Sequence, residues 1–429
     1  MNTAKFRCLL LLPLLLGIPQ FSYATRNKRH CHTDYRQQQH RHNGLGMKSY
    51  GDYTYYGLWG KGNNPVVFSS SGYYELELDK LPLAAALPQI PWSGDYWPFN
   101  RGGPAYRWQI QESVFKYQLL SKKKIKRLSL DKIAKLSPAE KYDIFMGRFD
   151  YPLTNYLRKI SAPDDEMWEG ICNGWSSASM HFSEPGPVVL KPSRGDRDLL
   201  IPFASADIKA LLSFAEANID SKCISCGLRC DLPLKKEDAH DGEKEEELAR
   251  NACSKRAQDI NPGAFHLILA NEIGIKKRSF VSEIDAGVMV WNQPTYRYHA
   301  TKIAERPADD LNDGVTVNIV SFNTTVEYTD ESDPSWGKCT SSDCLKEDNY
   351  TYDLYLDRFG RIMGGKWTGE SVLNHPDFVW RTEKPKIHTS LELAVDEDDS
   401  DSETFEIDFS GIEKIYQASI KAEQNRDEE

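Results

Sequence analysis

An α+β fold, with helices in the first half and antiparallel strands in the second, is predicted by two patterns in the sequence. Helical signals come first: Ser137 is an N-cap followed by Pro138 and the capping-box residue Glu140, and residues 205–215 are amphipathic with helical spacing. Strand patterns follow, in segments bounded by turn residues: 265–271, 278–284, 315–322, 326–328, 350–357 and 362–367. This order favours a layer of helices packed on an antiparallel sheet.

Residues 90–108 interrupt this pattern. Their proline and glycine content excludes regular structure, while Trp92, Trp97 and Trp108 need a place to be buried. We therefore expect an ordered loop that wraps the domain. Residues 73–78 are predicted to be a short strand, and the turn at 357–360 to join the last two strands.

The first 24 residues have the pattern of a secretory signal. Lys5 and Arg7 precede an apolar run at 9–18, and small residues end at Ala24. The run is too short to span a membrane, and no later segment is apolar enough. We expect a secreted protein, extracellular or periplasmic, after cleavage near Ala24.

The rest of the chain divides into three segments. Residues 25–75 are a polar, basic, histidine-containing arm, 76–390 a catalytic domain with a charged, cysteine-flanked insertion near 223–253, and 391–429 an acidic tail in which residues 404–409 could pair as an edge strand. The net charge of −10 comes from this tail, because residues 392–429 hold 14 acidic and three basic side chains. The chain has no basic field that would attract nucleic acid.

The cysteines favour disulfides over a metal site. Eight cysteines remain after the signal is removed, and the oxidising compartments that an exported protein reaches favour disulfides between them. Zinc ligation is the alternative, but the spacing lacks the usual paired pattern, so we predict no metal there. The disulfide candidates are Cys223, Cys226, Cys230, Cys253, Cys339 and Cys344.

Cys172 is the candidate nucleophile. It lies between Gly170 and Gly174 and is followed by small, helix-compatible residues, which predicts a thiol at the first turn of a helix. The helix dipole and free N–H groups there favour the thiolate, the form that attacks carbonyl carbons. The alternative interpretation is that Cys172 pairs in a disulfide.

A histidine and a carboxylate follow Cys172 in the chain order of the papain-like thiol enzymes. Folding the predicted hairpin about residues 274–277 places Asp285 opposite His266, so that His266 is the general base and Asp285 orients its ring. The alternative is a core histidine. Asn292 is a second candidate for the orienting group.

Trp168 and Trp175 are candidate oxyanion donors beside the Cys172 backbone N–H, with core packing as the alternative. No cofactor is required by the pattern. Calcium is the one candidate, at Asp330, Glu331, Asp333 and Asp357, but a solvated acidic surface explains these residues better, since they form no loop of alternating ligands.

Nine short segments, in order over about residues 90–381, resemble the transglutaminase elicitor family of oomycetes and bacteria. They are PWSGDYWP (91–98), GGPAYRW (102–108), SPAEKYD (137–143), CNGW (172–175), DIKALL (207–212), NPGAFH (261–266), VWNQP (290–294), GGKW (364–367) and HPDFVW (375–380). The resemblance implies a papain-like core, with Cys172 and His266 on family motifs and Asp285 outside them. The insertion at 234–253, the acidic tail and the extra cysteines depart from the family pattern.

The activity that the resemblance implies is that of a protein-glutamine gamma-glutamyltransferase, an acyltransferase that joins glutamine to lysine or to a primary amine through a Cys172 thioester. Its partners would be proteins that carry glutamine and lysine, or small amines. Two alternatives stay open: a papain-like cysteine protease or glutamine deamidase, and a non-enzymatic secreted binding protein.

Overall fold

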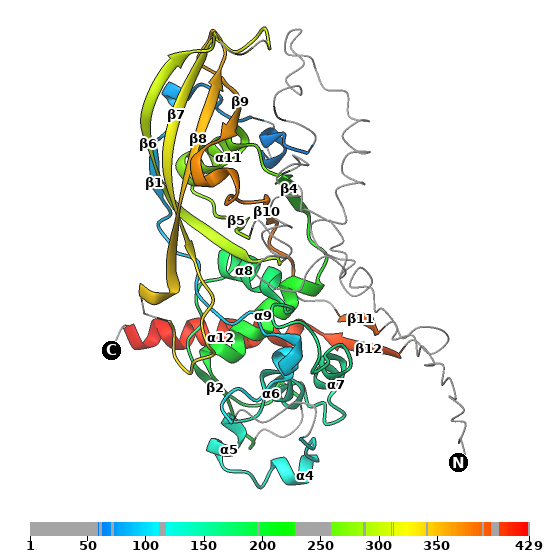
Figure 1. Cartoon of the computed structure of the whole chain (residues 1–429). Helices are drawn as coiled ribbons and strands as arrows, with labels where there is room; N and C mark the ends of the chain where they lie inside the picture. Colours follow the sequence, from blue (N-terminus) through cyan, green and yellow to red (C-terminus); the bar gives the residue numbers. More distant parts are fainter. Residues whose placement is uncertain are drawn as a thin grey trace, which may run out of the picture.

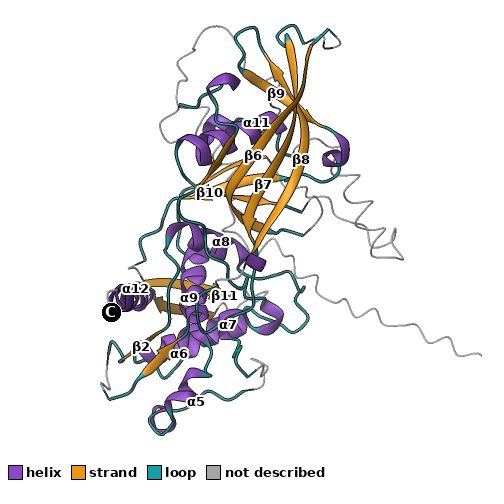
Figure 2. Ribbon diagram, turned by 90° about the vertical axis from the view of Figure 1, so that its left-hand side faces the viewer, coloured by secondary structure: helices purple, strands orange, loops and turns teal. Residues whose placement is uncertain are grey.

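The computed structural model has two parts, an antiparallel sheet and a group of helices, stacked along the long axis of the molecule (Figures 1 and 2). It describes residues 59, 62–69, 73–110, 117–194, 198–227, 259–285, 289–309, 311, 313–339, 342–387, 390–395 and 403–427. Each part has its own hydrophobic core. The predicted α+β class is confirmed, while the predicted signal peptide and most of the arm lie outside the described residues.

The sheet has eight strands, and all strand pairings among its described residues are antiparallel. In order across the sheet these are β4 (Cys223–Gly227), β10 (Phe378–Thr382), β5 (Phe280–Glu283), β6 (Asn292–Pro307), β7 (Asn318–Thr329), β8 (Leu345–Leu356) and β9 (Ile362–Trp367), with β1 (Ala84–Ala86) paired to β6. The strands predicted at 315–322, 326–328, 350–357 and 362–367 are therefore found, the first two as one strand. The β8–β9 turn is also confirmed, because the Gly360 N–H donates to the Asp357 carbonyl over 3.0 Å.

The strand predicted at 265–271 is wrong. This segment is α11 (Pro262–Ile268), continued by a π-helical turn at Leu269–Ile275, and it packs on one face of the sheet (Figure 1). The Asn261 side chain accepts the Gly263 N–H, and Pro262 occupies the first turn, so the helix has a proper start. Its residues are buried all round, and an unbroken apolar run does not distinguish helix from strand.

The helical part lies below the sheet in Figure 1. It contains α4 (Lys122–Ile125), α5 (Leu130–Ala134), α6 (Pro138–Phe145), α7 (Pro152–Lys159), α8 (Cys172–His181) and α9 (Ser205–Asn218), with a hairpin of β2 (Val188–Leu190) and β3 (Ile201–Phe203). The predicted capping box is present: Ser137 Oγ accepts the Glu140 N–H, and the Glu140 carboxylate accepts the Ser137 N–H. The amphipathic segment 205–215 is the body of α9.

The acidic C-terminal segment is more than a tail, and the edge strand considered at 404–409 is present as β12 (Glu403–Asp408). The segment also forms β11 (Ser390–Val395) and α12 (Ser410–Asp427), in which Ile412 and Ile415 are fully buried. Phe409 stacks on Phe214 of α9 with 5.7 Å between ring centroids. The described part of this segment therefore completes the core of the helical part.

The predicted loop at 90–108 is confirmed, with only the short 3-10 turns Phe99–Arg101 and Gly103–Ala105. Trp92 and Trp97 are buried beneath it, and Trp108 is half-buried. The short strand predicted at 73–78 is wrong: one bridge, Glu77 to Arg361, is all the pairing there, and Leu78–Lys80 is a 3-10 turn.

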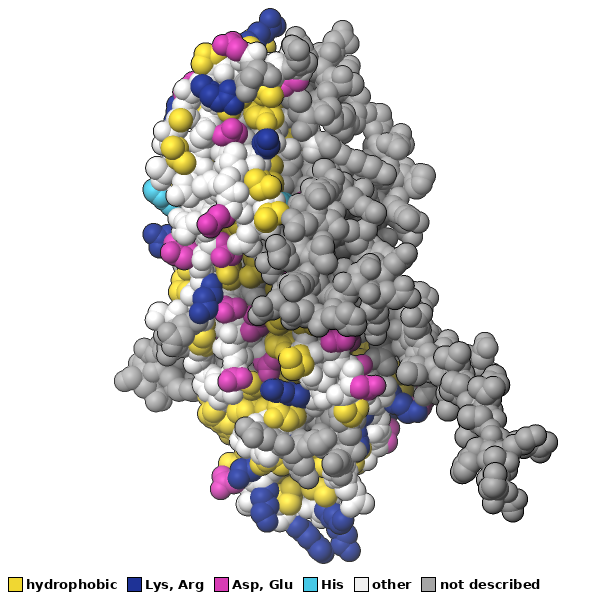
Figure 3. Space-filling model, viewed as in Figure 1, with side chains coloured by type: hydrophobic (Ala, Val, Ile, Leu, Met, Phe, Trp, Pro, Cys, Tyr) yellow, Lys and Arg dark blue, Asp and Glu magenta, His cyan; other side chains and the backbone are white. Residues whose placement is uncertain are grey.

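Charges of both signs are mixed over the face drawn in Figure 3, and dark-blue side chains gather at its lower end, where α4 and its flank carry five basic residues between 122 and 127. No helix in the described part of the chain is long and apolar enough to cross a membrane.

Gly174 sets the distance between α8 and α9. A Cβ at this position would lie 2.1 Å from the Ser213 carbonyl oxygen. We expect Gly174→Ala to push the two helices apart and to lower the free energy of unfolding by about 3 kcal/mol, because a backbone atom cannot move aside as a side chain can. Denaturant unfolding measures the change. Gly337→Ala is the control, since nothing lies within 4 Å of its Cβ. Equal stability of the two variants would contradict this packing.

Candidate functional site

The Cys172 thiol lies where the two parts of the molecule meet. It occupies the first residue of α8, as the sequence predicts, and it is free, so the disulfide alternative is wrong. Its Sγ lies 3.4 Å from Nδ2 of Asn292 and 3.8 Å from the carbonyl oxygen of Val290. The thiol is thus held by the strand β6 and by the residue that leads into it.

The side-chain amide of Asn292 is oriented by a second hydrogen bond. Trp380 of β10 donates its indole N–H to Oδ1 of Asn292 over 2.8 Å. An indole N–H can only donate, so the amide oxygen must face Trp380 and the amide NH₂ must face the sulfur. Asn292, predicted as a second choice for a supporting role, is the polar side chain that the structure brings to the thiol.

The turn between β5 and β6 is fixed by Glu283. Its Oε1 accepts the backbone N–H groups of Asp285 and Trp291 at 2.9 and 3.1 Å, and Ile284 N–H donates to the Trp291 carbonyl at 3.1 Å. These bonds close the turn just before Asn292. Asp285 therefore lies at the start of this turn, and not opposite His266 as the predicted hairpin required.

His266 belongs to a different environment. Its Nδ1 lies 2.8 Å from the Tyr352 hydroxyl, which in turn lies 2.7 Å from Thr324 Oγ1, and its ring packs against Phe322. The side chain is 1% exposed, and burial lowers its pKa to about 4. The structure does not bring His266 to Cys172, because α11 replaces the strand on which that contact depended.

The thiol has a high pKa. Burial is the main cause and raises the pKa of Cys172 to about 11; the Asn292 amide and backbone N–H groups oppose it, while the charge of Glu331 adds to it. The expectation of a helix-dipole-stabilised thiolate is therefore wrong for the closed site, since desolvation outweighs the donors. Catalysis near neutral pH requires a group that takes the proton.

Alkylation of Cys172 should report this pKa. We expect the rate with iodoacetamide to rise about tenfold per pH unit between pH 7 and 10, because only the thiolate reacts. Peptide mass spectrometry follows the site. Cys226, also free and buried, has a pKa raised even further by desolvation and should react more slowly at every pH. A rate that levels off below pH 8 would show that the thiol pKa is low.

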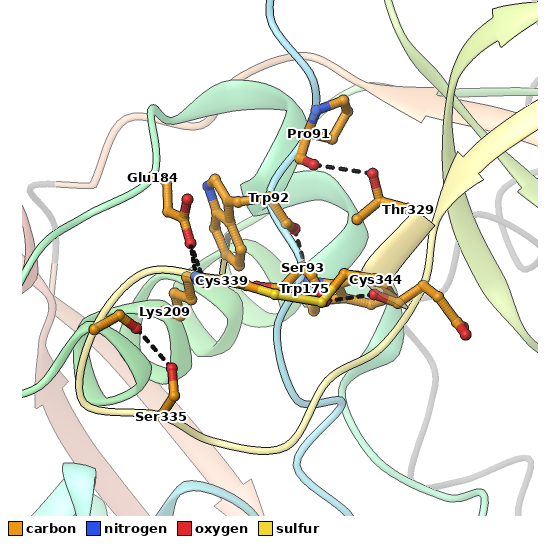
Figure 4. Close-up of a disulfide and its surroundings, with 12 residues drawn as sticks. Pro91, Trp92, Ser93, Trp175, Glu184, Lys209, Thr329, Ser335, Cys339 and Cys344 are labelled. Carbon is orange, nitrogen blue, oxygen red and sulfur yellow. Dashed lines mark hydrogen bonds and ion pairs between the residues drawn. A yellow bond between two sulfur atoms is a disulfide. The ribbon is translucent and has the colours of Figure 1, made fainter. Parts of the chain in front are cut away.

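The two tryptophans differ in their surroundings. Trp175 is fully buried, and its indole N–H donates to the Trp92 carbonyl over 3.2 Å, so its donor is used in the core and not offered to a substrate (Figure 4). Trp168 is half-buried in the loop before α8. The same loop approaches Tyr96 closely: the Ile171 N–H donates to the Tyr96 carbonyl at 2.7 Å.

The structure supports part of the disulfide prediction. Cys339 and Cys344 are bridged beside Trp92 and Lys209 (Figure 4), and Cys223 is disulfide-bonded. Cys226 is a free, fully buried thiol, so the prediction that it forms a disulfide was wrong. Cys230 and Cys253 lie outside the described residues.

The acidic residues considered for calcium do not form one cluster. Asp357 is paired with Arg361 at 2.6 Å, and Asp333 is exposed. Within the described ranges, no group of three or more His, Cys, Asp or Glu side chains could hold a metal ion.

Two comparisons with known proteins found a match. The sequence profile of the transglutaminase elicitor family matches residues 165–401, a range that includes Cys172, Asn292 and Trp380. The crystal structure of the GP42 transglutaminase from Phytophthora sojae is similar with a TM-score of 0.59 and 20% identity, over 81% of this chain and 94% of that one. At this identity the likeness establishes the fold. Among curated proteins, none matches the sequence.

Proposed function

Since this chain belongs to the transglutaminase elicitor family, we propose that it is a protein-glutamine gamma-glutamyltransferase with Cys172 as its nucleophile. One observation carries the assignment to this residue. Cys172 is a free thiol at the start of a helix, inside the family segment, and an oriented amide N–H points at its sulfur. A thiol with a donor beside it suits acyl transfer, in which charge develops first on sulfur and then on oxygen.

The first half of the reaction forms a thioester. Sγ of Cys172 attacks the carboxamide carbon of a glutamine side chain, the C–S bond forms, and the C–N bond breaks. The thiol proton leaves with the amide nitrogen as ammonia. Asn292 Nδ2 is placed to donate to the sulfur as it becomes anionic or to the carbonyl oxygen of the tetrahedral intermediate.

The second half consumes the thioester. A lysine side chain or another primary amine attacks the carbonyl carbon, the C–N bond forms, and the C–S bond breaks to return the thiol with one proton from the amine. Cys172 is only 8% exposed, so a substrate must open the site before either half proceeds. A closed site also keeps water from the thioester, which favours transfer over hydrolysis.

The protein is proposed to act outside the cell on proteins that carry glutamine and lysine. The export signal in residues 1–24 supports this, although it lies beyond the described residues. N-terminal sequencing of protein recovered from the medium or periplasm should start at Thr25, whereas an intact terminus inside the cell would contradict export.

The activity is tested by incubating the mature protein with a glutamine-containing protein and a labelled amine, with and without calcium. Mass spectrometry separates the outcomes: an amine adduct or a glutamine–lysine cross-link supports the proposal. Deamidated glutamine without adduct would show a hydrolase, and a cut chain would show a protease. No product with any of several acceptor proteins would leave a binding protein as the better interpretation.

A further inference from the structure

A dense group of basic side chains lies at one end of the molecule, away from the candidate site. Residues 122–135 hold six lysines and one arginine against a single acidic side chain, Asp131. We call this group the basic patch, and its members are Lys122, Lys123, Lys124, Lys126, Arg127, Lys132 and Lys135. All seven side chains are exposed. The helices α4 and α5, which carry most of them, lie at the lower end of Figure 1, where Figure 3 shows Lys and Arg side chains gathered.

The basic patch differs in sign from the rest of the chain. Residues 122–135 have a net charge of +6, whereas the whole chain has −10, so the remaining residues carry −16. An anionic surface therefore attracts this end of the molecule and repels the remainder, which gives the protein one preferred orientation. Five of the seven cations fall within residues 122–127 and repel one another, and an anionic partner would relieve that repulsion.

The backbone beneath the basic patch is anchored in the core of the helical part. Ile125 of α4 and Ile133 of α5 are 0% and 2% exposed, and both belong to that core. The lysines around them therefore stand on backbone that is already fixed. A partner that binds here does not have to order the chain first, which lowers the entropic cost of association.

An exposed apolar side chain lies within the same segment. Leu130 is 44% exposed, and in the sequence it lies between Arg127 and Lys132. Lysines interspersed with exposed leucine are typical of segments that bind at a membrane interface, where the cations contact anionic headgroups and the apolar side chain enters the acyl boundary. Clusters of four to eight basic residues are the usual sequence signature of anionic-lipid binding.

The composition and the position of the basic patch favour a lipid surface over a soluble acidic protein. Six of its seven cations are lysines, which act as point charges on flexible stems and suit a fluid layer of headgroups. Arginine is the residue that matches carboxylates in a fixed geometry. The patch also lies at an extremity of the molecule, where a broad, flat partner meets no obstruction (Figures 1 and 2).

We propose that the basic patch binds the surface of a lipid bilayer that carries anionic headgroups. The lysines contact the headgroups, and Leu130 enters the boundary between the headgroups and the acyl chains. The junction of the two parts, where Cys172 lies, stays clear of the bilayer because the helices α6 to α9 separate it from this end (Figure 1). The proposal does not depend on the proposed acyl transfer.

Binding is measured by co-sedimentation of the mature protein with vesicles. Vesicles of phosphatidylcholine with about one third phosphatidylglycerol should bind the protein at least about tenfold more tightly than phosphatidylcholine alone, and salt of about 0.5 M should remove this preference. The triple variant Lys123→Gln, Lys124→Gln, Arg127→Gln should bind anionic vesicles about 100-fold more weakly, since each basic residue near such a surface contributes about fivefold. Leu130→Ser should weaken binding by about threefold.

A matched control removes three exposed lysines from the sheet: Lys302→Gln in β6, Lys346→Gln in β8 and Lys366→Gln in β9. This variant should bind anionic vesicles within about twofold of wild type, because charges beyond a Debye length of about 10 Å from the bilayer are screened. Both triple variants keep the basic arm at 25–75, so a difference between them does not come from the arm. Their melting temperatures should match that of wild type.

Equal binding to neutral and anionic vesicles would overturn the proposal, as would an equal loss in the two triple variants. Tighter binding to double-stranded DNA or to polyglutamate than to anionic vesicles, at the same salt, would also overturn it, because the partner would then be a soluble polyanion. Vesicle binding requires no amine incorporation, so a failure of the proposed function and a failure of this proposal are seen in separate measurements.

Discussion

Cys172→Ala is expected to abolish amine incorporation, by roughly 10⁴-fold or more, because no acyl-enzyme can form without the sulfur. The fold should survive. The change removes one atom from a small, largely buried side chain and leaves the Asn292 amide without one partner, which together cost about 1–2 kcal/mol. The measurement is the initial rate of label transfer, together with the melting temperature.

Cys226→Ala is the matched control for this variant, since Cys226 is also a free, buried thiol and lies in β4, within the core of the sheet. Its replacement should destabilise the protein to a similar extent and leave the rate within about threefold. An inactive Cys226 variant beside an active Cys172 variant would mean that Cys226, and not Cys172, is the nucleophile.

The position of the proposed nucleophile was predictable because its signal is local. Gly170 and Gly174 flank the cysteine, and both are needed where the backbone of another segment comes close. A Cβ on Gly170 would lie 2.5 Å from the Tyr96 carbonyl oxygen, and a Cβ on Gly174 would lie 2.1 Å from that of Ser213. The two glycines that flank the cysteine are therefore required by close backbone packing, and this is why the sequence pattern located the helix start correctly.

The surroundings of the proposed nucleophile were harder to predict, because they are distant in the sequence, and Asn292 was predicted only as a second candidate. Asn292 lies 120 residues beyond Cys172, and Trp380, which orients its amide, lies another 88 residues beyond Asn292. The error at His266 arose from an apolar segment that fits a helix and a strand equally well. Asn261 and Pro262 were the available signal, since a capping side chain followed by proline is typical of a helix start.

The C-terminal segment shows that amino-acid composition alone can fail to predict a folded, partly buried helix. Its acidic residues dominate the count, but Phe409, Ile412 and Ile415 recur at spacings that place them on one side of a helix and its approach. These three side chains are fully buried. The charge composition therefore missed the buried side of this segment, which the spacing of its apolar residues predicts.

Asn292→Ala is expected to lower the rate of amine incorporation by about 10²- to 10³-fold while the substrate KM changes little. The amide N–H stabilises charge that develops on sulfur or oxygen only as the reaction proceeds, so its loss acts on kcat.

Asn292→Asp is the sharper variant: it keeps the size, accepts from Trp380 as before, and places an acceptor instead of a donor against Sγ. It should be at least as inactive and should slow alkylation of Cys172, because a second negative charge raises the thiol pKa.

Two comparisons make the Asn292 prediction specific. Trp380→Phe removes the bond that orients the amide but leaves the amide itself, so it should cost less, about tenfold. Asp285→Ala should retain more activity than Asn292→Ala, because Asp285 lies at the far end of the turn that Glu283 closes. A nearly inactive Asp285→Ala beside an active Asn292→Ala would contradict this assignment. It would mean that the catalytic arrangement forms around the Asp285 carboxylate once the site opens, and that the hydrogen bond from Asn292 to Sγ of Cys172 exists only in the resting state.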